Sequence, residues 1–282
     1  MVQLDARQIP ARKKAKRFWP YALTGALVGM LLALVWQFPA VWVSMAVSRF
    51  SAGRVQLLEA SGSLWNGSAV LGVAGGAGSH DARVLPGRLS WKLRPQWWHG
   101  TWMPALRLEL EQPCCMPETD TAWLLLQPGW ESLRFELYDL HYAVPASFLQ
   151  GLGTPWNTLG LDGTLRVSVD RWSGWWSHGR LEQQGWAVVR MQTMASRLST
   201  VRPLGSYRLE WTAGDAAARY HLTFELATEH GPLQLSGRGA WQVGSPWRIS
   251  IEAGAEPQYQ QALASLLSLL GNRRGLVTGR TR

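Results

Sequence analysis

Apolar and polar residues alternate one by one along most of the chain beyond residue 54. This period-two pattern is found in the segments 89–94, 106–111, 132–137, 161–170, 207–211, 220–226, 233–235 and 247–251. Successive side chains of a β-strand point to opposite faces of a sheet, so each segment is predicted to be a half-buried strand. One wet face and one dry face are typical of antiparallel meanders, whereas parallel sheets give continuous apolar runs. The pattern therefore predicts a mainly β fold built on a curved antiparallel sheet.

The period changes to that of a helix near the C-terminus. Leu263, Leu266, Leu267 and Leu270 recur at spacings of three and four, which predicts a helix over 257–271. Residues 272–282 are expected to be a flexible tail.

The β domain is predicted to span residues 48–271. A break around residues 154–159 suggests two lobes, 54–150 and 160–271. Three segments within the domain run into a glycine, at Gly62, Gly163 and Gly237, and then continue as alternating strands. Each of these glycines is predicted to mark a strand bend or a tight hairpin.

A nearly uncharged apolar run over residues 18–43 precedes the β domain. Its 18 residues from Trp19 to Trp36 carry no charge, and a helix of that length covers roughly the hydrocarbon thickness of a bilayer. We predict a single transmembrane helix, with Pro39 as a helix end or kink. Basic residues 12–17 favour a cytoplasmic tail over residues 1–17, so the β domain is expected in the periplasm.

A cleaved signal peptide is the alternative for this run. The preceding region is basic, and Ser44, Met45 and Ala46 form a small-x-small triplet. The apolar run is, however, longer than a usual signal sequence, and its tryptophans resemble interfacial anchors.

Charge adds little beyond this topology. The net charge is +9, of which the first 17 residues supply +5 through six basic residues and one acidic residue. The positive charge is therefore mainly an orientation signal, and nucleic-acid binding is not expected.

The only two cysteines, Cys114 and Cys115, are adjacent. They allow a vicinal disulfide, two free thiols or an intermolecular bridge. No disulfide framework is predicted.

Motifs for catalysis, metal or cofactor binding are missing from the sequence. The six histidines form no H-x-x-x-H or H-E-x-x-H spacing, and there is no C-x-x-C, G-x-S-x-G or Walker loop. Acidic pairs such as Glu109 and Glu111 share a wet strand face and are typical of solvation. We predict no enzyme, no cofactor and no pocket that brings a nucleophile and a base together.

Tryptophans gather near expected strand ends. The candidates for contact with a partner or with lipid are Trp97, Trp98, Trp172, Trp175 and Trp176. Packing at the rim of a curved sheet is the structural alternative, and a groove for lipid chains or for an extended strand is another.

Two motifs carry a family resemblance. The first includes Ser61, Gly62, Leu64, Trp65 and Gly67, and the second comprises Trp91, Leu93 and Pro95. Together with the apolar run, they make the chain similar to the type II secretion system protein N family, also called general secretion pathway protein N.

The resemblance implies a single-pass inner-membrane protein of a Gram-negative bacterium, with a periplasmic β domain. It also implies a non-enzymatic assembly or scaffolding role in exporting folded proteins across the outer membrane. The implied partners are the inner-membrane platform proteins and the secretin. The family is similar to AsmA-type β-groove proteins, so binding or transfer of lipid is the alternative function.

Overall fold

The computed structural model describes residues 19–76, 82–100, 102–117, 121–214, 221–242 and 245–271. The chain divides into two compact units, Met1–Phe38 and Pro39–Arg282. The expected tails, 1–17 and 272–282, lie outside the described residues.

The apolar run forms two helices rather than one. Helix α1 spans Trp19–Trp36 in the first unit, and α2 spans Ala40–Phe50 in the second. Pro39 between them is extended, with φ −69° and ψ 145°; proline donates no backbone hydrogen bond and disfavours helical geometry in the residue before it. The predicted break at Pro39 is confirmed, whereas the prediction of one helix over residues 18–43 is wrong. Within the described residues, no helix combines the length and apolarity needed to cross a bilayer.

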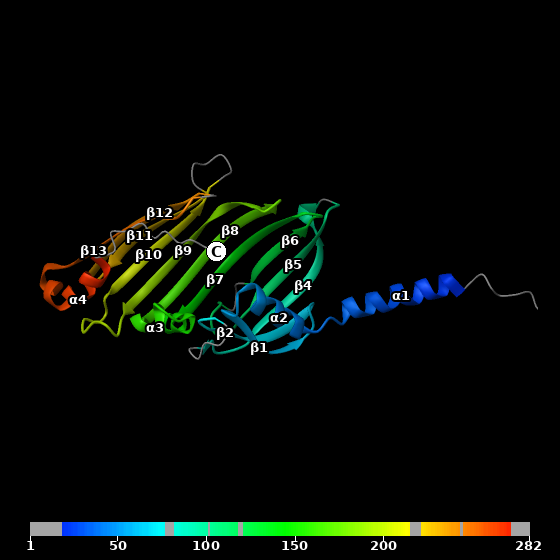
Figure 1. Ribbon diagram of the computed structural model, residues 1–282, viewed down its shortest axis with the longest axis horizontal. Helices are drawn as coiled ribbons and strands as arrows, with labels where there is room; N and C mark the ends of the chain where they lie inside the picture. Colours follow the sequence, from blue (N-terminus) through cyan, green and yellow to red (C-terminus); the bar gives the residue numbers. More distant parts are fainter. Residues whose placement is uncertain are drawn as a thin grey trace, which may run out of the picture. The chain divides into compact units, whose positions relative to one another are not determined.

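The second unit is built on one antiparallel sheet. Its strands are β1 (Val55–Gly62), β2 (Asn66–Val73), β3 (Arg83–Val84), β4 (Leu89–Trp97), β5 (Pro104–Glu111), β6 (Ala122–Pro128), β7 (Ser132–Pro145), β8 (Asp162–Ser177), β9 (Arg180–Ala195), β10 (Gly205–Ala213), β11 (Leu222–His230), β12 (Leu233–Trp241) and β13 (Arg248–Ala255). Neighbours in sequence are neighbours in the sheet, except that the short β3 pairs only with β2. Figure 1 shows this open, twisted meander. The predicted mainly β, antiparallel fold is confirmed.

The connections between strands define two rims. In a meander, alternate connections lie at opposite ends of the strands. We call the hairpin ends of β4–β5, β6–β7 and β8–β9, residues 97–104, 128–133 and 175–181, the tip rim. The opposite end, with the described residues of the connections 74–88, 111–122, 145–162 and 195–205 and with helix α4 (Gln260–Gly271), is the core rim.

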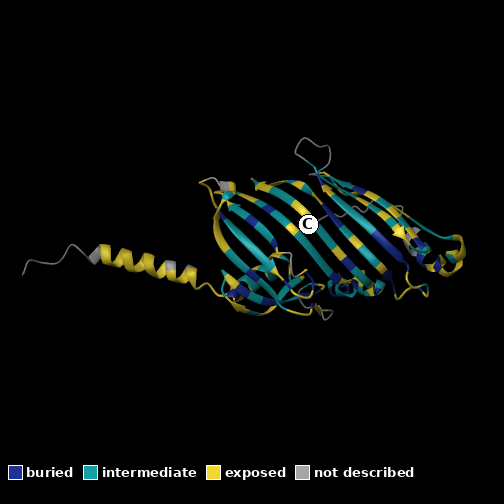
Figure 2. Ribbon diagram, turned by 180° about the vertical axis from the view of Figure 1, so that it is seen from behind, coloured by how far each residue is buried: buried dark blue, intermediate teal, exposed yellow. Residues whose placement is uncertain are grey.

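The main hydrophobic core lies at the core rim. Leu85, Cys115, Ala146 and Leu204 come from its connections and pack in one cluster with strand residues such as Tyr207. In Figure 2, buried segments gather near this end of the sheet, where Figure 1 places α3 (Trp156–Leu159) and α4. The 3-10 helix η2 (Ala146–Leu152) also belongs to this rim.

The predicted C-terminal helix is confirmed. A 3-10 turn, η3 (Pro257–Tyr259), leads into α4 (Gln260–Gly271). Leu263 and Leu266 are buried in the core cluster and Leu267 packs against it, as the spacing predicts.

The two cysteines form a vicinal disulfide in the connection between β5 and β6. Cys115 is buried in the core cluster, and its carbonyl oxygen accepts a hydrogen bond from the Ala143 amide at 2.7 Å. The sequence allowed a vicinal disulfide, two free thiols or an intermolecular bridge, and the structure contains the vicinal disulfide.

Candidate functional site

The Ser61–Gly67 motif builds the hairpin between β1 and β2. Gly62 pairs with Gly67, and Gly62 has a φ of +88°, which favours glycine. A Cβ atom on Gly62 would lie 2.5 Å from the Asn66 carbonyl oxygen. The predicted tight turn at Gly62 is therefore present. Gly163 also has a positive φ, whereas Gly237 lies within β12, paired with Ile251, and forms no turn.

Trp91 fastens β4 to this hairpin. Its ring lies over Gly67, where an added Cβ atom would come within 2.4 Å of the ring. The Trp91 indole nitrogen donates to the Leu64 carbonyl at 3.2 Å. The Leu93 amide donates to the Trp65 carbonyl at 2.7 Å. The two family motifs are thus one structural unit.

Helix α2 packs on the same unit. Trp91 is buried with Ala40 of α2 and Ala69 of β2, and Val43 and Leu57 pack against them. The remaining motif residues lie close by: the Ser61 hydroxyl is 3.2 Å from that of Ser68, and Pro95 pairs with Leu106. The motif therefore fixes the edge of the sheet where the chain enters it.

Arg88 reinforces this edge and was not predicted from the sequence. Its guanidinium donates to the Glu59 carbonyl at 2.7 Å and to the Ser61 hydroxyl at 3.0 Å, and it forms an ion pair with the Glu59 carboxylate at 3.3 Å. An isolated arginine carries no local signal in sequence, because its partners lie 27 and 29 residues away.

The tip rim holds four of the five predicted tryptophans. Trp97 ends β4, Trp98 begins η1 (Trp98–Gly100), and Trp175 and Trp176 lie at the end of β8. Trp172 lies further back in β8, where it pairs with Leu137 and Gly185. Sequence reasoning missed the two most exposed indoles of the rim. Trp102 is 90% exposed and Trp130 is 100% exposed. Each is a single tryptophan in a connection between strands, where there is no alternation of apolar and polar residues to predict its position.

Side-chain contacts join the three hairpins of the tip rim. The Gln127 amide donates to the Met103 sulfur at 2.9 Å, which connects the first hairpin with the second. His178 lies 3.4 Å from the Glu131 carboxylate, which connects the third with the second. Trp97 and Trp102 pack edge to face at a centroid distance of 5.9 Å. The hairpin ends therefore form one continuous surface.

A buried carboxylate lies just behind this surface. Glu136 of β7 lies 3.0 Å from His99 Nε2 and 3.4 Å from the Arg171 guanidinium, and it accepts a hydrogen bond from the Tyr138 hydroxyl. Burial first, then the hydrogen bond and the negative charge of Glu136, raise the pKa of Tyr138 to about 12, and Arg171 opposes the shift. Contacts from a guanidinium, an imidazole and a phenol compensate the burial of this carboxylate.

Tyr138 also belongs to a stack of side chains across β5–β8. The Trp123 and Tyr138 rings lie parallel with centroids 4.0 Å apart. The Arg107 guanidinium covers Trp123 at 4.7 Å, and the Arg171 guanidinium covers Tyr138 at 5.4 Å. Such cation–π and aromatic pairs between neighbouring strands stiffen the sheet below the tip rim.

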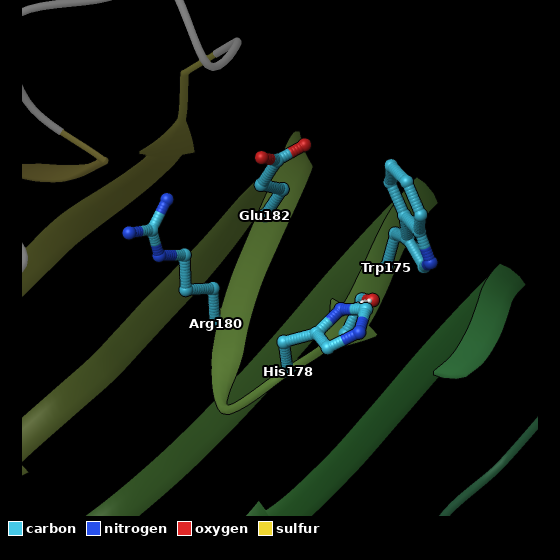
Figure 3. A pocket seen from close by; sticks show the side chains of 5 residues that line it. Trp175, His178, Arg180 and Glu182 are labelled. Atoms are coloured by element: carbon cyan, nitrogen blue, oxygen red, sulfur yellow. Dashed lines mark hydrogen bonds between the residues drawn. The ribbon is translucent and has the colours of Figure 1, made fainter. Parts of the chain in front are cut away.

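An open depression lies at the β8–β9 hairpin (Figure 3). It has a volume of about 380 Å³ and is lined by Trp175, Ser177, His178, Arg180 and Glu182. A neighbouring depression of about 300 Å³ joins Trp98, Arg134 and Glu136 to the same hairpin. The first depression lies at the tip rim, and the second lies at the rim and just behind it.

The first depression brings a hydroxyl and an imidazole together. Ser177 Oγ lies 2.7 Å from His178 Nδ1, so the prediction that no nucleophile meets a base is wrong. The carboxylate of Glu131 lies 3.4 Å from the other imidazole nitrogen, so a hydroxyl, an imidazole and a carboxylate are in a row. The side chains of His178 and Glu131 are, however, 76% and 66% exposed. Water screens such contacts, and a nucleophile is activated in sites that exclude it. The arrangement is that of a polar hairpin turn.

A larger cavity of about 880 Å³ lies over β10–β13. Charged side chains such as Glu225, Arg238 and Glu252 line it together with Leu226 and Ile249. Across the described parts of the chain, no group of three or more His, Cys, Asp or Glu side chains is arranged to hold a metal ion.

Comparison with known protein families matches residues 53–279 to the family "Type II secretion system (T2SS), protein N". The match covers the whole sheet and α4. Neither a curated protein nor a solved structure matches the chain.

Proposed function

Because the chain belongs to the type II secretion system protein N family, we propose that it is a non-enzymatic assembly or scaffolding subunit of that system. In this role it would help to export folded proteins from the periplasm across the outer membrane. The observation that supports this proposal is the family match. It begins two residues before β1 and covers every strand of the sheet. A long sheet with a packed edge and one exposed rim suits a scaffold that other subunits contact.

We propose the inner membrane as the location, with the N-terminus in the cytoplasm and the sheet in the periplasm. The supporting observation is α1, which falls short of the length and apolarity of a spanning helix but whose described residues are apolar around the whole helix and exposed, among them Leu23, Leu27, Met30 and Leu34. A helix that is hydrophobic all round is typical of a buried or membrane-embedded segment. Protease protection in spheroplasts tests this proposal: cleavage of the sheet by external protease is expected only after the outer membrane is opened.

We propose the inner-membrane platform proteins and the secretin as partners. A deletion strain tests the role, with secreted type II substrates and secretin multimers measured separately. Loss of secretion with normal secretin multimers would assign the chain to the platform side, and loss of both would assign it to secretin assembly. Normal secretion together with normal secretin would contradict the proposal.

A second candidate function, binding of lipid in a β-groove, is favoured by the cavity over β10–β13. Its volume of about 880 Å³ and its Leu226 and Ile249 lining would suit acyl chains, whereas its charged side chains would not. Native mass spectrometry of the full chain released from gentle detergent tests it. Co-purified phospholipid that is lost in Leu226→Glu, but kept in the matched variant Leu198→Glu, would favour the groove.

A further inference from the structure

The tip rim exposes an unusual concentration of large apolar side chains. Exposed members are Trp97, Trp102, Met103, Trp130, Leu133, Trp175, Trp176 and Leu181. Over the described residues beyond Phe50, these make up about half of the large hydrophobic residues that are exposed. A patch of this kind marks an interaction surface in a folded protein.

The backbone of the rim limits what can bind there. Its three hairpins end in turns, and the tip ends of β4 (94–97) and β9 (180–184) are paired on one side only, so the room for an added peptide strand is limited to these two short segments. The depressions on the rim are shallow and are lined by charged groups such as Arg134, Arg180 and Glu182. These depressions therefore offer no apolar pocket for the anchor side chain of a protein partner.

The chemistry of the exposed side chains fits a bilayer surface. Tryptophan combines a large apolar ring with one N–H donor, and it concentrates at the level of the lipid headgroups. Trp102 and Trp130 project from separate turns, with Glu131 and His178 between the second and third hairpins. A fluid interface adapts to separate projecting rings and solvates the charges between them, so it needs no preformed complementary shape.

We propose that the tip rim docks on a phospholipid membrane by inserting its indole rings into the interfacial layer. The contacts between the hairpins hold the rings in one surface before docking, which lowers the entropic cost of insertion. This inference does not rest on the proposed role in secretion, because it follows from the exposed side chains alone.

Fluorescence of an environment-sensitive probe tests the proposal on the full chain. A single reporter is placed at Trp130→Cys, and the control reporter at Leu198→Cys, which is 40% exposed in the β9–β10 connection of the core rim. The native cysteines are paired with each other and do not compete for the label. Each labelled chain is reconstituted in vesicles of phosphatidylcholine, alone or mixed with phosphatidylglycerol, with or without a lipid that carries a doxyl quencher.

The expected result is a blue shift and quenching at position 130, without either at position 198. Trp97→Ser combined with Trp102→Ser should reduce the quenching at position 130, while the matched core-rim variant Trp156→Ser should leave it unchanged. Circular dichroism of each variant confirms an intact sheet.

Three results would overturn the proposal. The first is equal quenching at positions 130 and 198. The second is a blue shift at position 130 without vesicles, which would assign the rim to a protein contact. The third is quenching that requires phosphatidylglycerol and survives loss of the tryptophans, which would assign the contact to arginines.

Discussion

The two rims of the sheet both carry large apolar side chains, but these are buried at the core rim and exposed at the tip rim. At the core rim, connections and α4 fold back, and apolar side chains such as Leu204 and Leu263 are buried. At the tip rim, the connections are short turns, and apolar side chains such as Trp102 and Trp130 face water. A single-layered open sheet has no second sheet to pack against. Here the connections and α4 at the core rim pack on the strands and form the hydrophobic core. The other rim can then present apolar groups without loss of the fold.

The largest test of this comparison replaces one apolar side chain at each rim. Leu263, with no exposed surface, lies in the core cluster. Leu263→Ala should lower the free energy of unfolding by about 2–5 kcal/mol, because it removes buried methyl groups and leaves a cavity. Trp130→Ala should change it by less than about 0.5 kcal/mol, because the ring is fully exposed.

Urea unfolding of the full chain in detergent, followed by far-ultraviolet circular dichroism, measures both variants. A loss for Trp130→Ala as large as that for Leu263→Ala would mean that the tip rim also carries a core.

The hairpin β1–β2 differs from the hairpins of the tip rim because the tryptophan that contacts it is buried. It lies beside β4, yet its indole partner, Trp91, is buried and lies over Gly67. Gly67→Ala should cost about 1–3 kcal/mol, because the added methyl group would push into the ring and overpack the site. The cost should shrink when Trp91→Ala is also present, since the two residues are in contact.

Gly254→Ala in β13 is the matched control. No atom lies within 4 Å of a Cβ atom at this position, so the change is expected to be neutral or stabilising by about 0.4–1 kcal/mol. Equal losses at positions 67 and 254 would show that strand flexibility, rather than the Trp91 contact, requires glycine.

Much of the fold follows from local sequence. The alternating segments became strands because a side-chain period of two is a property of each strand alone. The leucine spacing near the C-terminus likewise sufficed for α4. One departure is β7, which continues to Pro145, well beyond the predicted 132–137 segment. Asp139 adopts a φ of +51° within it, and apolar residues change from odd to even positions there. A positive φ at a non-glycine residue depends on tertiary contacts and has no local signal.

The candidate site was less predictable. Four tryptophans of the rim, and Trp172 behind it, were found because they cluster in sequence, whereas Trp102 and Trp130 stand alone. The partners of Glu136 come from positions 99, 138 and 171, and no spacing along the chain connects them. Strand pairing brings such groups together, so only the register could have revealed them.

The smallest expected effects concern two tyrosines, one near each rim. Burial raises the pKa of Tyr207 at the core rim to about 12, and its hydroxyl donates to the Leu233 carbonyl at 3.1 Å. The ordinary pKa of tyrosine is about 10. A raised pKa in the folded state gives stability that is complete below pH 10 and is lost as the pH rises through about 12. Tyr207→Phe should cost about 1 kcal/mol at neutral pH through the lost hydrogen bond, and it should flatten the alkaline decline.

Tyr138, behind the tip rim, should respond to its neighbour as well. Glu136→Gln removes a negative charge and an ionised acceptor that both raise the pKa of Tyr138, so this pKa should fall, while burial keeps it above its ordinary value. The pKa of Tyr207 should stay unchanged, because burial alone raises it. Ultraviolet titration of tyrosinate, assigned with Tyr138→Phe and Tyr207→Phe, measures both groups. An unchanged Tyr138 titration in Glu136→Gln would mean that the Glu136 cluster does not hold this phenol, and that the two rims protect their tyrosines in the same way.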